Sequence, residues 1–416
     1  MIDDAKLLLL AVTAIQSQIS AIVSDAPPDF HERLDVLLDK LATGDLAARR
    51  EILDLFSKHP AAYKILISGI EGLNVELIQF RKSEPLSMPV VTEAFVRVPV
   101  LYATNRANAG SILRNPYYSS DRAPMRYGEA EVSIPLDHRI GEIERPVWWK
   151  MEFNEDPTRH VTITNVNQIE EISFLDRLRS AIDPEILLFV HGYNMTFADA
   201  LRRTAQMAVD FRFPGLPILF SWPSQGQTHK YLVDETNAQW AVDDLERLIL
   251  ATMEQSKARS IHIIAHSMGA RILTQVLERI SKISLPREAT RLRQIIFAAP
   301  DIDAETFKKA VAQFWSHSER CTLYASSNDE ALAISKTLHG YPRAGDAGEH
   351  ILVMKGLDTL DASTMDTSLL GHSYYGSKRS ILSDIHDLLR YGHDPDGRFG
   401  LVPRTHITGS YWMFQS

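Results

Sequence analysis

The ten residues from Ser260 to Gly269, SIHIIAHSMG, contain the side chain best placed to act as a nucleophile. An apolar β-branched run predicts a buried strand over 261–265, and a helical pattern begins at Met268. A serine at such a turn, here Ser267, has its hydroxyl lifted clear of its neighbours and lies beside the first N–H groups of the helix. The turn needs small flanking residues, and Gly269 supplies one, whereas Ala265 stands where the G-x-S-x-G pattern has its first glycine. The alternative is a tight turn that merely contains a serine.

A serine nucleophile also needs hydrogen-bond donors for the oxyanion that its attack creates. The stretch from Phe189 to Asn194, FVHGYN, ends an earlier predicted strand, and Gly192 lets the backbone turn so that the Tyr193 N–H is exposed. We predict that the amides of Tyr193 and Met268 form the oxyanion hole. His191 belongs to this loop and precedes the serine, so we expect it to shape the loop rather than to act as the base.

The general base should be a histidine that follows the last strand and reaches back over the sheet edge. His372, in the stretch LGHSY at 370–374, precedes the last predicted helix at 376–389 and fits this position. The alternative is a loop histidine with no catalytic role.

Three aspartates compete for the acid that orients this histidine, and each follows a predicted strand. Asp329 follows the penultimate strand, beside the strand that leads to His372, and we predict that it is the acid. Asp301 follows the strand next to the serine strand, and with Asp303 it could instead cap a helix. Asp358 shares the loop of the histidine, where it could serve only to shape that loop.

The elements that would position these residues alternate between strands and helices over 186–360. Strands are expected at 186–190, 216–221, 260–266, 294–299, 321–325 and 350–354, and helices at 197–211, 234–255, 268–283, 305–315 and 329–337. Earlier strands at 98–104 and 130–135 precede a short one at 160–164, which we place at an antiparallel edge. The pattern predicts an α/β fold with a mainly parallel sheet covered by helices on both faces, and ligands bind at the carboxyl ends of such strands.

Residues 1–84 carry only helical patterns, with apolar residues spaced three and four apart. We expect an all-α N-terminal domain, a linker at 85–95 and a catalytic domain at 96–416. The apolar stripes could pack on each other or on the main domain, or they could join two copies of the chain as a homo-oligomer.

The net charge of −9 and the pI near 5.9 give no electrostatic reason to expect a nucleic-acid partner. Cys321 is the single cysteine, which excludes an internal disulfide and fits a cytoplasmic location. No run approaches the roughly 20 apolar residues of a membrane span, and Asp3 and Asp4 oppose a signal peptide.

Several motifs resemble the α/β-hydrolase superfamily, in particular a bacterial esterase/lipase-like branch with little functional characterisation. They are YATNR at 102–106, HGYN at 191–194, FSWPS at 220–224, AHSMG at 265–269, FAAPDID at 297–303 and GHSY at 371–374. The resemblance implies a Ser–Asp–His triad in that chain order and points to the same loop for Asp329.

We therefore expect a serine hydrolase that cleaves a small-molecule or lipid ester through an acyl-enzyme, with no metal or organic cofactor. Gly192 and Trp222 are the expected substrate-binding residues. Trp222 and Tyr193 are candidates for the wall of the acyl pocket, or else core aromatics. Thioester, amide or lipid hydrolysis by the same residues is one alternative, and a non-catalytic module acting through its helical N-terminus is another.

Overall fold

The computed structural model describes residues 95–109, 117–146, 155–180, 185–283, 292–328, 339–364 and 378–415, together with Val36, Leu37, Lys40, Glu51, Leu332 and Ser335. By its internal contacts the chain divides into two units, and the second, residues 94–108, 117–144 and 157–416, contains the strands and helices discussed below. The predicted helical domain at 1–84 lies outside the described residues, apart from four of them, and remains a prediction.

The second unit is built on one sheet of eleven strands in the order β10-β11-β9-β8-β7-β6-β4-β5-β1-β2-β3. Their bounds are β1 (Phe95–Asn108), β2 (Tyr118–Pro135), β3 (Thr162–Ile169), β4 (Glu185–Val190), β5 (Leu216–Ser221), β6 (Ser260–His266), β7 (Leu292–Ala298), β8 (Arg320–Ala325), β9 (Asp358–Asp361), β10 (Leu401–His406) and β11 (Gly409–Phe414). Across the sheet, the neighbouring strands β11, β9, β8, β7, β6, β4, β5 and β1 are all parallel. The remaining strands, β2 and β3 at one edge and β10 at the other, run antiparallel to the strands beside them. The predicted mainly parallel sheet with an antiparallel N-terminal edge is confirmed.

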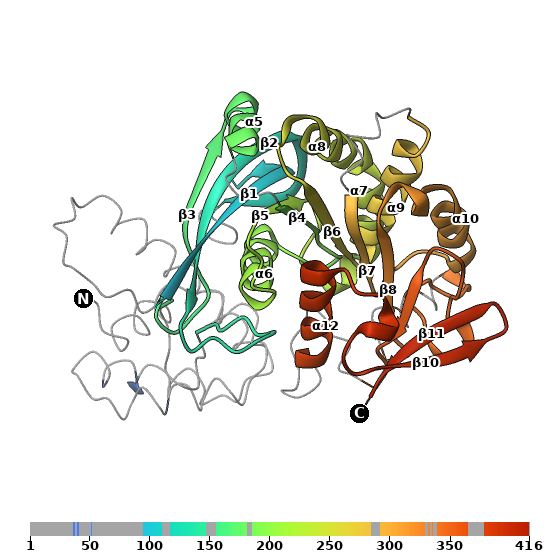
Figure 1. Ribbon diagram of the computed structural model, residues 1–416. Helices are drawn as coiled ribbons and strands as arrows, with labels where there is room; N and C mark the ends of the chain where they lie inside the picture. Colours follow the sequence, from blue (N-terminus) through green and yellow to red (C-terminus); the bar gives the residue numbers. More distant parts are fainter. Residues whose placement is uncertain are drawn as a thin grey trace. The chain divides into compact units, whose positions relative to one another are not determined.

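Helices cover both faces of the sheet (Figure 1). In β4, Leu188 and Val190 enter one hydrophobic core while Leu187 and Phe189 enter the other, because successive side chains of a strand point to opposite faces. The first core is closed by α5 (Glu171–Ser180), α7 (Tyr231–Trp240), α8 (Val242–Gln255), α9 (Met268–Ile280) and α10 (Ala304–Phe314), and the second by α6 (Phe197–Asp210) and α12 (Lys378–Tyr391). Within the described ranges, none of the helices has the length and apolar character needed to cross a membrane.

The last of the expected parallel strands is not where the sequence placed it. Residues 350–354 do not form a strand, and β9 (Asp358–Asp361) pairs with β8 instead. Ile351, Leu352 and Val353 are nevertheless buried, and the chain turns back at Gly356, which has a φ of 84°. The apolar run at 350–354 is therefore explained by the burial of an irregular segment and not by a strand.

Two further elements differ from expectation. The single helix expected at 234–255 is divided into α7 and α8 at Ala241, whose N–H group bonds both Asn237 and Ala238. The segment after α12, for which the sequence predicted no strand, contains the β10–β11 hairpin. Trp412 of β11 pairs with Leu360 of β9, so the hairpin extends the sheet beyond the last expected strand.

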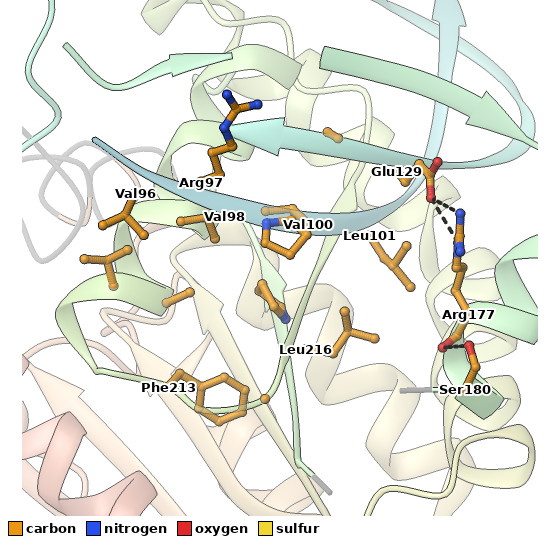
Figure 2. Close-up of a pocket in the computed structure, with 16 residues that line it drawn as sticks. Val96, Arg97, Val98, Val100, Leu101, Glu129, Arg177, Ser180, Phe213 and Leu216 are labelled. Carbon is orange, nitrogen blue, oxygen red and sulfur yellow. Dashed lines mark hydrogen bonds and ion pairs between the residues drawn. The ribbon is translucent and has the colours of Figure 1, made fainter. Parts of the chain in front are cut away.

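A cavity separates the first halves of β1 and β5. The two strands pair only over 101–104 and 218–221. Just before this register β1 contains Pro99 and β5 contains Pro217, and proline has no N–H group to donate to a neighbouring strand. The strands diverge there and enclose about 700 Å³ (Figure 2). This cavity lies at the amino ends of the parallel strands.

Candidate active site

Ser267 occupies the sharp turn between β6 and α9, as the sequence predicted. Its backbone has a φ of 49° and a ψ of −120°, a conformation that residues other than glycine rarely adopt and that costs on the order of 1–3 kcal/mol. Backbone hydrogen bonds hold it there. The Ser267 N–H donates to the Ala298 carbonyl at 2.9 Å, and the Ser267 carbonyl accepts from the Asp301 N–H at 3.2 Å. The strained turn is thus tied to the end of the neighbouring strand β7 and to the loop that follows it.

Two glycines let the surrounding backbone approach this turn. A Cβ atom on Gly269 would lie 2.3 Å from the His191 carbonyl oxygen, so α9 could not pack against the end of β4 with a larger residue. A Cβ atom on Gly192 would lie 3.0 Å from Ser267 Cβ and 2.7 Å from His266 Nδ1. The loop after β4, expected to supply the oxyanion hole, therefore lies directly against Ser267.

The serine hydroxyl is buried in the turn, where Ser267 is 4% exposed. Among the residues that the structure describes, no group forms a hydrogen bond with Ser267 Oγ. The expected base His372 and the expected acid Asp329 both lie outside the described residues and remain predictions. Met268 opens α9, so its N–H is among the first four of the helix, which have no partner within the helix.

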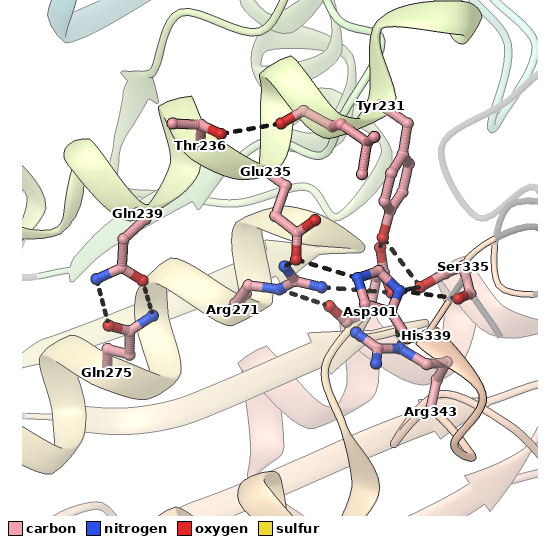
Figure 3. Close-up of polar contacts among 11 residues, drawn as sticks. Tyr231, Glu235, Thr236, Gln239, Arg271, Gln275, Asp301, Ser335, His339 and Arg343 are labelled. Atoms are coloured by element: carbon pink, nitrogen blue, oxygen red, sulfur yellow. Dashed lines mark hydrogen bonds and ion pairs between the residues drawn. The ribbon is translucent and has the colours of Figure 1, made fainter.

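Asp301, the second candidate for the acid, has a carboxylate with several partners (Figure 3). It is 2% exposed and accepts hydrogen bonds from the Tyr231 hydroxyl, the Ser335 hydroxyl and Arg343 Nε, the last at 3.0 Å. No histidine in the described part of the chain donates to it. Asp301 therefore joins α7, the loop after β7 and the segment around 335–343 into one buried ionic cluster beside Ser267.

The outer part of this cluster contains His339, one of the histidines that follow Ser267. His339 Nε2 lies 3.2 Å from Glu235 Oε1, and its Nδ1 lies 2.9 Å from the Ser335 carbonyl oxygen. Arg271, one helical turn after Ser267 in α9, also bonds Glu235 and donates to the Asp301 carbonyl at 3.1 Å. These contacts brace α9 against α7 just beyond the turn.

The third acid candidate, Asp358, does not lie in the loop of the histidine. It is the first residue of β9, next to Thr322 in the register, and its carboxylate pairs with Arg320. It is therefore near the amino edge of the sheet, whereas Ser267 follows the carboxyl end of β6. The capping role considered for these aspartates belongs to Asp303, which accepts from the Thr306 N–H at 2.8 Å at the start of α10.

His191 shapes the loop after β4. Its ring stacks on Trp222 with centroids 5.1 Å apart, its Nδ1 lies 2.8 Å from the Gly192 carbonyl oxygen, and its own carbonyl accepts from Trp222 Nε1 at 2.7 Å. Burial lowers the pKa of His191 to about 3 and that of His266 to about 4, so neither brings a positive charge to the turn at neutral pH. Trp222 is fully buried, and its packing favours the core alternative over a position in the wall of an acyl pocket.

A buried arginine holds the loop after β4 to the loop after β5. Arg106, at the end of the YATNR motif, is 1% exposed. It donates to the Met195 carbonyl at 2.7 Å, to the Ser224 carbonyl at 2.9 Å and to Ser221 Oγ at 2.9 Å. Burial lowers the pKa of Arg106, and the negative charge of Asp234 opposes this effect.

Asp234 also holds the loops after β4 and β5 together. Its buried carboxylate accepts from the Asn194 N–H at 3.1 Å, the Gln225 N–H at 2.7 Å and the Ser224 hydroxyl at 2.6 Å. Asn194 itself has a φ of 56°, in the left-handed region. Sequence reasoning assigned no role to Arg106 or Asp234. The YATNR motif was the available signal for the arginine, while Asp234 was indistinguishable from an ordinary acidic residue at a helix start.

Comparisons with known proteins agree with this architecture. A family model described as "Alpha/beta hydrolase of unknown function (DUF900)" matches residues 167–390, more than half of the chain. An uncharacterized protein of Nostoc sp. is 25% identical over 166 residues, which cover 34% of this chain and 43% of that relative.

Solved structures that resemble the chain include two hydrolases. A predicted CIB-like hydrolase from Thermoplasma acidophilum is 18% identical, with a TM-score of 0.29, and the match covers 54% of this chain and 90% of that one. Esterase B from Lactobacillus rhamnosis, inhibited by a tributyrin phosphonate, is 8% identical, with a TM-score of 0.29, and the match covers 79% of this chain and 97% of that one. At these scores neither likeness bears on the activity of this chain.

Proposed function

Because this chain belongs to the family of α/β hydrolases of unknown function, we propose that it is a serine hydrolase that cleaves carboxylic esters through an acyl-enzyme at Ser267. The observation that carries the proposal is the backbone of Ser267, held at a φ of 49° between β6 and α9 with Gly192 packed against its Cβ. Strain of this kind persists only where the surrounding structure enforces it, and it is concentrated at functional sites.

In the proposed reaction, Ser267 Oγ attacks the ester carbonyl while His372 accepts its proton and Asp329 orients the imidazole. The amides of Tyr193 and Met268 would stabilise the oxyanion of the tetrahedral intermediate. His372 would then protonate the leaving alkoxide, and water would release the acid from Ser267 by the same steps. No residue in this scheme requires a metal or an organic cofactor.

The strained turn also favours catalysis over the alternative of a non-catalytic module. A fold that did not use Ser267 would gain stability by relaxing the turn or by replacing the serine with glycine, which adopts a positive φ without strain. Here the neighbouring backbone, two close glycines and a buried arginine all support the loops around this serine.

The proposal is tested with a panel of p-nitrophenyl esters from acetyl to dodecanoyl, with thioester and anilide analogues. We expect turnover of at least one ester by the wild type and its loss in Ser267→Ala, together with covalent labelling of Ser267 by an alkyl fluorophosphonate. Faster turnover of thioesters or anilides than of esters would reassign the substrate class. Absence of both turnover and labelling would contradict the enzyme assignment.

The acid is assigned by comparing Asp329→Asn with Asp301→Asn. By analogy with asparagine replacement in a known triad, Asp329→Asn should lower turnover by about 10⁴ while the fold remains intact. Asp301→Asn should mainly lower the unfolding temperature, because Arg343 would lose its buried partner. Near-normal turnover in Asp329→Asn with loss in folded Asp301→Asn would place the acid after β7.

A further inference from the structure

We propose that the cavity between β1 and β5 binds one aliphatic chain with an anionic head group, at the edge of the sheet opposite Ser267. The cavity encloses about 700 Å³, within the usual range of roughly 300–1,000 Å³ for small-molecule sites. This site would be separate from the catalytic one, since it lies at the amino ends of β1 and β5 and Ser267 follows the carboxyl end of β6.

The open space is a feature of the strands themselves. Residues of β1 before Leu101 remain paired with β2, from Phe95 opposite Pro135 onward. Leu216 and Pro217 at the start of β5 remain paired with β4. Each strand is thus held from its outer side while the edges that face each other are apart. The gap is preformed, and a ligand would not need to separate paired strands to enter it.

The walls of the cavity are mostly apolar and come from both layers of the fold. Val98, Val100 and Ala208 belong to the core under α6, whereas Leu101 and Leu216 belong to the core under α5 and α8. Phe213 and Leu216 lie across the cavity from the β1 side chains in Figure 2. An apolar space lined by residues of both cores suits a flexible unbranched chain, which can follow an irregular wall, better than a rigid ring system.

Arg177 brings a positive charge to the place where the cavity meets α5. The other charged lining residues are Glu129, which pairs with Arg177, and Arg97, which lies four residues before Leu101 in β1 and pairs with Glu131 at 3.2 Å. Arg177 is oriented by Glu129 Oε2, which accepts from its Nε at 3.1 Å and lies 3.0 Å from its Nη2 (Figure 2). A carboxylate could bind the guanidinium N–H groups of Arg177 that Glu129 does not use, so the ligand class that we propose is a long-chain carboxylate.

The test is calorimetric titration of the full chain with dodecanoate, below its micelle concentration, and with dodecanol as the uncharged counterpart. We expect saturable binding of one dodecanoate per chain and binding of dodecanol that is about tenfold weaker, the order expected for one charge-assisted hydrogen bond. Ala208→Phe and, on the β2 wall, Ala130→Leu should abolish binding by filling the cavity. Ala312→Phe, on an exposed position of α10, is the matched control and should bind normally.

The head-group contact is tested by Arg177→Met against Arg179→Met on the same helix. Arg177→Met should remove the preference for dodecanoate over dodecanol, and Arg179→Met should retain it, because Arg179 bonds Gln255 and Asp176 and does not line the cavity. The proposal is overturned if the full chain shows no saturable binding. It is equally overturned if both filling variants, with normal unfolding temperatures, still bind dodecanoate, since the ligand would then occupy another site.

Discussion

Gly192 is the residue through which the loop after β4 touches Ser267. A methyl group there would lie 2.7 Å from His266 Nδ1 and 3.0 Å from Ser267 Cβ, so the loop would have to move away from the serine. We expect Gly192→Ala to fold and to lose turnover by about 10²–10³, the effect of removing one oxyanion donor. Ester assays measure the loss of turnover, and thermal unfolding shows whether the variant is folded. Gly397→Ala, whose added methyl would meet only His393 Cβ at 3.8 Å, is the control. Normal turnover in folded Gly192→Ala would mean that the hole lies elsewhere.

Arg106 should act as a positioning residue, because it bonds the loops after β4 and β5 without touching Ser267 in the contacts described. Arg106→Lys keeps the charge but cannot reproduce the three bonds to Met195, Ser224 and Ser221. We expect kcat to fall about tenfold or more with little change in KM, since an oxyanion contact matters most in the transition state.

The control for this arginine is Arg122→Lys, because Arg122 bonds Asn237 of α7 from a more exposed position. It should leave kcat and KM unchanged. If Arg106→Lys lowers the unfolding temperature yet keeps a normal kcat, then Arg106 stabilises the fold without positioning the loop.

At the scale of elements, α6 connects the loop after β4 to an ion pair at the far end of the helix. His138 Nε2 lies 3.0 Å from Asp210 Oδ1 at the end of α6, and its Nδ1 lies 2.8 Å from Glu144 Oε2. Burial opposes a charge on His138, but the hydrogen bonds that the ring donates to Asp210 and Glu144 outweigh it and raise the pKa of His138 from 6.5 to about 9. The loop after β2 is thereby fastened to α6 by a charged histidine.

This pair predicts a specific dependence of stability on pH. Because the pKa of His138 is raised in the folded state, charged His138 stabilises the fold in full below about pH 6.5, and this stabilisation is lost as pH rises through about 9. Its contribution to the free energy of unfolding should be about 3 kcal/mol at most. Urea unfolding of the wild type and His138→Asn should differ strongly near pH 6 and much less near pH 10. A pH-independent difference would contradict a charged His138, and His350→Asn, at an exposed position, is the control.

The central parallel strands could be predicted because they are buried on both faces and read as continuous apolar runs. β5 and β6 begin and end at the residues expected. β9 could not be predicted, since its sequence DTLD is short and polar while the apolar run before it is buried without pairing. A run of apolar residues predicts that a segment is buried, but it cannot distinguish a strand from a packed irregular segment.

The site shows the same limit for charged residues. Ser267, Gly192 and the helix start at Met268 could be placed because a strand, a turn and a helix follow one another locally in the sequence. The partners Arg106 and Asp234 come from segments far apart in the chain, and a buried charge has no periodic signature. Only the fold brings these charges to the two loops, so their role could be found only in three dimensions.

On the scale of the whole molecule, the sheet-based unit begins at residue 94, contains its own two cores and includes Ser267, Gly192, Arg106 and Asp234. A chain shortened to begin at Pro89 should therefore fold and keep its ester turnover. The apolar stripes predicted for 1–84 must be buried somewhere, so we expect their removal to change the oligomeric state or the tendency to aggregate. Size-exclusion chromatography with light scattering and ester assays on the two chains measure both properties. A shortened chain of unchanged oligomeric state and full activity would show that residues 1–84 are needed neither for assembly nor for catalysis. A shortened chain that folds but has lost its ester turnover would show that residues 1–84 contribute to catalysis.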